Sequence, residues 1–212
     1  MGTTEGPPDS SRLVIFDVDG VLYRYDREVR TRALAGSLGV SPGAVDDALF
    51  GSGIEDRADA GELGADAYLE AVSDRLGVRV ERDHWVLAWA EAATPDYATL
   101  GLAARACRVA KVAALSNNGA LLREEAPRIL PELVALVLDR LFVSGGLRVA
   151  KPDPAAYWAV VDTCGFAPGD ALFVDDSEAN VEGARLAGLG AHHYSRPEGL
   201  ADFLAANGLL PA

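Results

Sequence analysis

Cysteine and histidine are both scarce in this chain. Its two cysteines, Cys107 and Cys164, lie far apart in apolar stretches, and no CxxC motif occurs. We therefore predict two reduced thiols that pack as small hydrophobic groups. Of the three histidines, His192 and His193 are adjacent, but no third ligand lies at a spacing typical of a metal site. A structural or surface role is the better prediction for this pair.

Basic residues are also few, with 19 Lys and Arg against 32 Asp and Glu and a formal net charge of −13. This charge disfavours polyanionic partners, so we expect no nucleic acid and no acidic membrane surface. No apolar run approaches the length of a membrane span. Residues 1–10 are polar and lack the basic start and apolar stretch of a signal peptide. We predict a disordered leader at 1–10 and a cytoplasmic protein of undetermined oligomeric state.

Short apolar runs predict the strands of a sheet. Half of all residues are apolar, which is enough for a sizeable core. Continuous apolar runs are typical of parallel strands that are covered on both faces, and helical patterns lie between them. We therefore predict an α/β fold with a parallel sheet. The predicted strands are 13–16, 111–115, 139–144, 171–174 and a weaker 191–194, and the predicted helices are 119–136, 154–164 and 178–188.

One connection is much longer than a crossover helix requires. About ninety residues separate the first two strands, and they read as successive helices. Ser41 suits a helix N-cap, and Gly77 suits a helix end. We predict a core of residues 11–21 and 95–212, with a helical insertion at 22–94. Its predicted helices are 27–38, 41–50, 64–77 and 82–93, and the buried face of the third is Ala67, Leu69, Val72 and Leu76.

Polar residues follow each strong strand. Because the carboxyl ends of parallel strands meet at one edge of a sheet, we expect these residues to converge on one site. Three or four neighbouring carboxylates repel one another unless a cation is present, and oxygen ligands favour a hard ion such as Mg²⁺. A lysine near a helix N-terminus suits a phosphate, and a carboxylate can attack phosphorus. The converging segments are Asp17-Val18-Asp19-Gly20, Ser116-Asn117-Asn118-Gly119, Lys151, and Asp175-Asp176-Ser177.

Four segments in order resemble the motifs of the haloacid dehalogenase-like (HAD) hydrolases. They are "DVDGVLY", "LSNN", "KPDPAAY" and "FVDDSEANVEGARLAG", and the resemblance covers nearly all of the chain from Leu13 onward. It implies a Rossmann-like core with a helical C1-type cap after the first motif. The cap segment "GSGIEDRADAGELGADAYLEAV" is more loosely similar to that of sugar-phosphate phosphatases, including the α-D-glucose-1-phosphate phosphatase type.

The resemblance also implies catalytic roles. Asp17 is expected to attack phosphorus, while Asp19 serves as general acid and then base and offers its backbone carbonyl to Mg²⁺. Lys151 is expected to pair with Asp17 and with the phosphate. Ser116 and the backbone N–H of Asn117 are expected to bind the phosphoryl oxygens.

The same resemblance implies that Asp17 and Asp176 are Mg²⁺ ligands, with Asp175 as a second ligand or a supporting residue. Which of Asp175 and Asp176 ligates the ion directly stays open. Gly20 permits the tight turn that lets both carboxyl groups of the first motif face the crevice.

The implied function is a Mg²⁺-dependent phosphatase that acts on a small phosphorylated metabolite through an aspartyl-phosphate. A phosphotransferase or mutase of the same fold, or a non-catalytic binding protein, is an alternative. A dehalogenase is disfavoured, because a halide leaving group needs no acid at the position of Asp19.

Several other residues have an ordinary structural interpretation. Asn118 is a candidate helix cap, and Ser177 likewise. Trp85 and Trp89 are four residues apart and are predicted to pack within the cap rather than to stack on a substrate. The charged run from Glu55 to Arg57 is predicted to be solvated, although Arg57 could reach a substrate.

Overall fold

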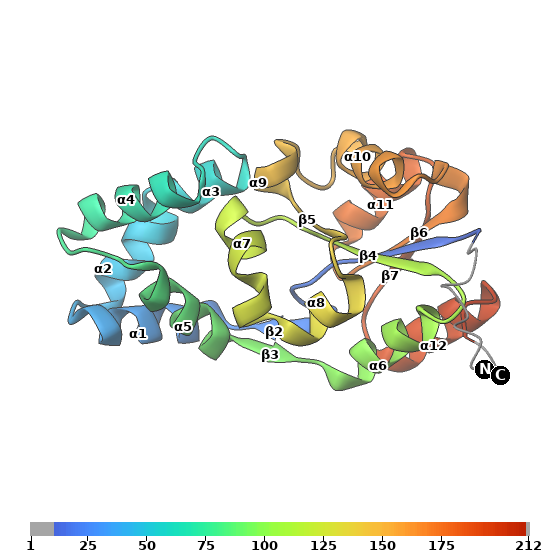
Figure 1. Ribbon diagram of the computed structural model, residues 1–212, viewed down its shortest axis with the longest axis horizontal. Helices are drawn as coiled ribbons and strands as arrows, with labels where there is room; N and C mark the ends of the chain where they lie inside the picture. Colours follow the sequence, from blue (N-terminus) through green and yellow to red (C-terminus); the bar gives the residue numbers. More distant parts are fainter. Residues whose placement is uncertain (1–10, 211–212) are drawn as a thin grey trace, which may run out of the picture.

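A parallel sheet forms the centre of the protein, for which a computed structural model describes residues 11–210. The predicted leader at 1–10 lies outside these described residues. Within them, five parallel strands are arranged in the order β5-β4-β1-β6-β7 (Figure 1). The order reverses beside the central β1, which is where open α/β sheets bind ligands. The strands are β1 (Leu13–Phe16), β4 (Lys111–Ser116), β5 (Leu141–Val143), β6 (Ala171–Asp175) and β7 (Gly190–His193).

Helices cover both faces of this sheet, which explains its continuous apolar strands. Val14 and Phe16 face one hydrophobic cluster, while Leu13 and Ile15 face the other. The first cluster includes α6 (Tyr97–Ala106), α8 (Pro131–Val137) and α12 (Pro197–Ala206). The second includes α10 (Pro154–Cys164) and α11 (Glu178–Leu186). The α/β prediction is therefore confirmed.

The long connection after β1 is helical, and we call its helices α1 to α5 the cap. The Asp26 carboxylate accepts from the backbone N–H of Glu28 and Val29, and the Ser41 hydroxyl from that of Ala44. Gly77 ends the fourth helix in the left-handed conformation, as predicted. The bounds are α1 (Arg27–Leu38), α2 (Pro42–Asp46), a π-helical turn (Asp47–Gly51), α3 (Ile54–Asp59), α4 (Ala65–Leu76) and α5 (Arg82–Ala92).

The predicted buried face of α4 was wrong at one position. Ala67 is exposed, and Tyr68 is buried in its place. The tyrosine hydroxyl is hydrogen-bonded to charged cap groups, so this side chain is buried without an unsatisfied polar atom.

A short antiparallel ribbon, which the sequence did not predict, joins the cap to the core. It pairs β2 (Tyr23–Tyr25) with β3 (Ala93–Pro95), and each strand is too short for alternation to be visible. The two strands lie at the two ends of the predicted insertion at 22–94. Those boundaries stay a prediction.

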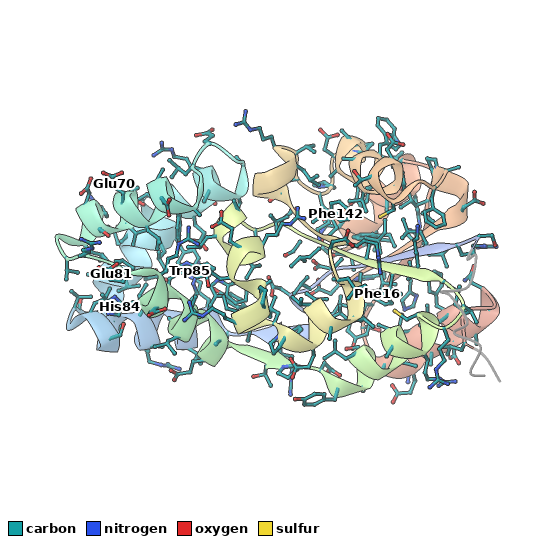
Figure 2. All side chains as sticks on the ribbon, in the orientation of Figure 1. Phe16, Glu70, Glu81, His84, Trp85 and Phe142 are labelled. Atoms are coloured by element: carbon teal, nitrogen blue, oxygen red, sulfur yellow. The ribbon has the colours of Figure 1, made fainter. Side chains whose placement is uncertain are left out.

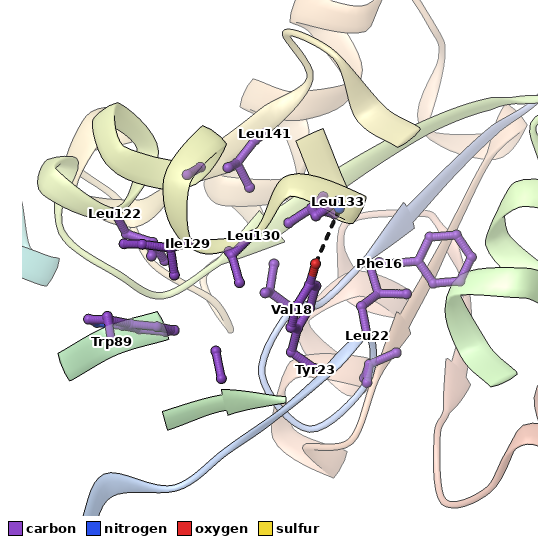
Figure 3. Packing of buried hydrophobic residues seen from close by; sticks show 14 of the residues in the cluster. Phe16, Val18, Leu22, Tyr23, Trp89, Leu122, Ile129, Leu130, Leu133 and Leu141 are labelled. Atoms are coloured by element: carbon purple, nitrogen blue, oxygen red, sulfur yellow. Dashed lines mark hydrogen bonds between the residues drawn. The ribbon is translucent and has the colours of Figure 1, made fainter. Parts of the chain in front are cut away.

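Cap and core share hydrophobic contacts across this ribbon. Figure 3 shows Trp89 of α5 near Leu122 and Ile129, within one cluster that extends to β1. In Figure 2, Trp85 lies among the cap helices, whereas Phe16 and Phe142 lie beside the sheet. Trp85 and Trp89 are buried and pack with their rings 6.2 Å apart, so the prediction that they pack within the cap is confirmed.

The predicted helix at 119–136 is in fact two helices, α7 (Ala120–Ile129) and α8 (Pro131–Val137). Leu130 between them leaves the helical conformation, because the ring of a following proline disfavours that conformation in the preceding residue. The predicted strand at 139–144 is shorter, since Ser144 already begins α9 (Ser144–Leu147).

The cysteines agree with the prediction of two reduced thiols. Cys107 and Cys164 are both unpaired, and Cys164 is buried, as predicted. Among residues 11–210, no helix combines the length and apolar character that crossing a membrane requires.

Candidate active site

The carboxyl ends of three strands bring the predicted polar residues together. Asp17 follows β1, Ser116 ends β4 and Asp175 ends β6, and all three are buried. Lys151 reaches this point from the loop before α10. Its Nζ donates to Asp17 Oδ1 at 2.6 Å and to Asp175 Oδ2 at 2.8 Å. Residues up to 158 positions apart in sequence thus form one buried charged cluster.

Asp176 completes a cluster of three carboxylates. Asp17, Asp175 and Asp176 each offer an oxygen, and these oxygens lie within 4.8 Å of one another. Gly20 makes the close approach possible, because a Cβ at this position would lie 2.2 Å from Asp176 Oδ2, and its φ is +87°. Such a set of oxygens fits a hard divalent cation.

Asp175 and Asp176 differ in the number of hydrogen bonds that their carboxylate oxygens accept. Asp175 accepts from Lys151, from the backbone N–H of Ser177 at 2.8 Å and from Asn180 Nδ2 at 3.0 and 3.1 Å. Asp176 is exposed, and within residues 11–210 its carboxylate has no recorded donor besides its own backbone N–H. The carboxylate oxygens of Asp176 are therefore the more available ones for a metal ion. Asp175 instead holds Lys151, Ser177 and Asn180 in place.

Asn118 connects Asp19 to Ser116. Its Nδ2 donates to Ser116 Oγ at 2.7 Å and to Asp19 Oδ2 at 3.0 Å. The other carboxylate oxygen, Asp19 Oδ1, is buried without a partner among the described residues. The prediction that Asn118 caps the next helix was wrong, because Gly119 occupies the N-cap position of α7.

The side chain of Asn117 has a positioning role that the sequence did not reveal. Its Nδ2 donates to the backbone carbonyl of Lys151, and its Oδ1 accepts from the backbone N–H of Lys151, both at 2.9 Å. This pair of hydrogen bonds fixes the loop that carries the lysine. Contacts between residues 34 positions apart leave no local signal in the sequence.

Burial determines the protonation of this cluster. It raises the pKa of Asp17 to about 7, against the opposing effect of Lys151. Burial also raises the pKa of Asp19, although the hydrogen bond from Asn118 opposes the shift. For Lys151, burial disfavours the ammonium, but the carboxylates of Asp17 and Asp175 raise its pKa overall. The lysine stays charged, and a further cation would favour ionised carboxylates.

The remaining candidate residues contribute no side chain to this cluster. Arg57 is exposed and pairs with Glu62 at 3.4 Å, which agrees with a solvated charge. The prediction of a solvated run was wrong for Glu55, which is partly buried and paired with Arg30. The His192 ring stacks on Phe203 at 4.8 Å. His193 Nε2 lies 2.9 Å from the backbone carbonyl oxygen of Asp176, so it contacts the loop that carries the third carboxylate. Ser177 is at the N-cap position of α11, but its side chain accepts no capping hydrogen bond.

Two curated relatives are phosphatases by name. Phosphatase MT3486 of Mycobacterium tuberculosis is 39% identical over 88 residues, which are 41% of this chain and 39% of that protein. Phosphoglycolate phosphatase 1 of Pseudomonas aeruginosa is 41% identical over 83 residues, 35% of this chain and 30% of that protein. The chain thus matches less than half the length of each.

Solved structures with a similar fold include two HAD enzymes. A HAD family enzyme from Bacteroides thetaiotaomicron, in complex with magnesium and inorganic phosphate, aligns with a TM-score of 0.72 and 21% identity, over 87% of this chain and 94% of that one. The L-2-haloacid dehalogenase of Xanthobacter autotrophicus aligns with a TM-score of 0.56 and 23% identity, over 94% and 84%.

The match to a family model extends across both cap and core. Residues 11–188 match the model of the haloacid dehalogenase-like hydrolases, which includes every residue of the charged cluster. The chain belongs to the haloacid dehalogenase-like hydrolase family.

Proposed function

We propose that this chain is a Mg²⁺-dependent phosphomonoester hydrolase that acts on a small phosphorylated metabolite. The observation that carries the proposal is the pairing of Asp17 with Lys151 beside Asp19. One carboxylate is held next to an ammonium that can bind phosphate, and the second has a buried oxygen without a partner. The phosphatase names of the two curated relatives support the same reaction class.

In the proposed reaction, an Asp17 carboxylate oxygen attacks phosphorus and the bond to the leaving oxygen breaks. Asp19 donates a proton to that oxygen and then takes one from the water that hydrolyses the aspartyl-phosphate. Lys151, Ser116 and the backbone N–H of Asn117 contact the phosphoryl oxygens. Positioning and charge neutralisation supply most of the rate enhancement in such reactions.

The carboxylate cluster fits a magnesium ion. Asp17, Asp176 and the backbone carbonyl of Asp19 would hold it, while Asp175 orients Lys151 and the loop of Ser177. When bound, Mg²⁺ would neutralise the charge that carboxylates and phosphate bring together. The Bacteroides enzyme, crystallised with magnesium and phosphate, supports this assignment.

Dehalogenation is the alternative that a structural neighbour raises. The presence of Asp19, fixed by Asn118, favours phosphate esters, because an alkoxide leaving group must be protonated and a halide need not be. Release of halide from 2-haloacids tests this alternative. Comparing free phosphate with phosphate transferred to a sugar hydroxyl separates the hydrolase from a transferase or mutase.

The proposal is tested by hydrolysis of p-nitrophenyl phosphate. Purified protein should release p-nitrophenol with Mg²⁺, and EDTA should stop the reaction. Asp17→Asn should reduce kcat by at least about 10³-fold without a change in circular dichroism. Asp202→Asn, at an exposed position on α12, serves as the control and should keep normal activity. Normal turnover by Asp17→Asn would refute the mechanism.

A further inference from the structure

A small cavity lies between the cap and the core, close to Asp19. Its wall comes from cap helices α3, α4 and α5 and from the start of α7. Asn118 lines it and also donates to Asp19 Oδ2, so one side chain separates this cavity from the proposed general acid. It has room for about one water molecule, so only a small group fits without movement of the cap.

One side of the cavity lies against an ion pair between the cap residues Arg30 and Glu55. Glu55 lines the wall and binds Arg30, with 2.6 Å between Oε1 and Nη1. Arg30 is buried, and its terminal nitrogens also donate to the hydroxyls of Tyr25 and Tyr68 at 3.2 and 3.0 Å. The guanidinium is therefore neutralised by Glu55, and its terminal donors are engaged. Its Nε has no partner among the described residues, but Arg30 does not line the cavity and so offers no site there for an incoming anion.

Asp59, in contrast, is an acid on the wall whose only recorded partner within residues 11–210 is the backbone N–H of Gly119. Within the same residues it forms no ion pair and no hydrogen bond with another side chain. Burial, followed by the charge of Glu55, raises its pKa to about 7. Asp59 is the last residue of α3, and a negative charge at the C-terminus of a helix is unfavourable. The carboxylate therefore does not stabilise this helix. One backbone N–H leaves most of the carboxylate's lone pairs unused, and these can accept from a group in the cavity.

We infer that Asp59 selects the alcohol part of the substrate. If the chain hydrolyses phosphate esters as proposed, the leaving oxygen lies at Asp19 and the group attached to it extends toward this cavity. A hydroxyl or ammonium there donates to the ionised Asp59 carboxylate, which repels a substrate carboxylate, and no lysine or arginine of the described residues lines the wall. The substrates are then phosphate esters of alcohols that carry a hydroxyl or amine, and phosphorylated acids such as phosphoglycolate are disfavoured.

Four two-carbon esters that differ only in their terminal group test this inference. They are ethyl phosphate, 2-hydroxyethyl phosphate, phosphoethanolamine and 2-phosphoglycolate. The wild type should show kcat/KM at least about tenfold higher for the hydroxyl or ammonium ester than for phosphoglycolate, with ethyl phosphate between them. The better of the two donor esters identifies which donor Asp59 takes. Equal or better hydrolysis of phosphoglycolate would overturn the inference.

Substitution then assigns the selectivity to one side chain. In Asp59→Asn, and in Asp59→Ser as a second neutral variant, the preference against phosphoglycolate should fall at least about tenfold. Asp56→Asn removes an exposed carboxylate from the same helix outside the cavity wall and should keep the wild-type ratio. An unchanged ratio in both Asp59 variants would refute the assignment. Wild-type protein that hydrolyses none of the esters, p-nitrophenyl phosphate included, would instead refute the proposed function.

Discussion

At the scale of single residues, the candidate site depends on close approaches that only a few side chains permit. Lys151 lies against two buried carboxylates, and Asn118 connects Asp19 with Ser116. Gly20 lets the loop after β1 meet Asp176, where any Cβ would overlap a carboxylate oxygen. Apart from the contact between Asn118 and Ser116, these contacts join segments that are distant in sequence.

Gly20→Ala tests the closest of these approaches. The added Cβ would displace Asp176, and the positive φ alone costs about 1–2 kcal/mol in a residue with a side chain. We expect lower thermal stability and at least about a tenfold loss of phosphatase kcat/KM, measured with p-nitrophenyl phosphate. Gly36→Ala is the matched control, because this exposed glycine lies within α1 with no atom near its added Cβ. It should be neutral or stabilising, and wild-type activity in Gly20→Ala would contradict the placement of Asp176.

At the scale of elements, short segments connect the cap to the core. The ribbon of β2 and β3 is anchored by Tyr23, whose hydroxyl donates to Glu132 at 2.9 Å and accepts from the backbone N–H of Leu133 at 3.3 Å. Figure 3 shows this second contact as a dashed line to α8. The tyrosine ring is buried among the residues that cap and core share. The ribbon is therefore held to the core by both packing and hydrogen bonds.

Tyr23→Phe should destabilise the protein by about 1–2 kcal/mol, because the buried N–H of Leu133 loses its partner. Chemical denaturation measures this change in the free energy of unfolding. Tyr97→Phe removes an exposed hydroxyl that contacts the same Glu132 at 3.3 Å, so it should have a much smaller effect. Equal effects of the two substitutions would contradict the anchoring role of Tyr23.

Asp59 at the end of α3 should make stability depend on pH. Its pKa is raised from an ordinary value near 4 to about 7 in the folded state, so the folded protein binds more protons between these values. Its contribution to stability is present at low pH and is lost as the pH rises through 7. Asp59→Asn removes this dependence, so its stability relative to wild type should increase between pH 5 and pH 8. Urea denaturation at a series of pH values measures the difference, and a constant difference would contradict the raised pKa.

At the scale of the whole molecule, glycines allow the backbone of the cap to contact the backbone of the core. A Cβ on Gly145 would lie 2.6 Å from the backbone carbonyl oxygen of Ala58 in α3. A Cβ on Gly61 would lie 2.5 Å from the carbonyl oxygen of Gly145. Because backbone atoms meet here, no rotamer change can relieve an added methyl group. This contact holds α3 and its cavity at a fixed position beside the proposed site.

Gly145→Ala should therefore push α3 away from the core and lower kcat/KM by roughly ten- to hundredfold through misplacement of the cap. Steady-state kinetics with p-nitrophenyl phosphate and with the two-carbon esters measure the effect. Gly146→Ala is the control, since its added Cβ would meet only a Val143 methyl at 3.6 Å. If both variants kept wild-type kinetics, the cap would not need this contact for activity.

The sequence by itself determined the strands of the parallel sheet, most helix ends and the polar residues at the strand ends, since local periodicity and capping residues specify these. Tertiary structure alone decided that Asn117 and Asn118 contact Lys151 and Asp19, that Asp175 is saturated while Asp176 is exposed, and that Asp59 meets the core. These contacts join distant segments, and no local pattern of residues encodes which side chains meet there. The orientation of a cap on a core depends on the packing of two surfaces, which is a property of the folded chain.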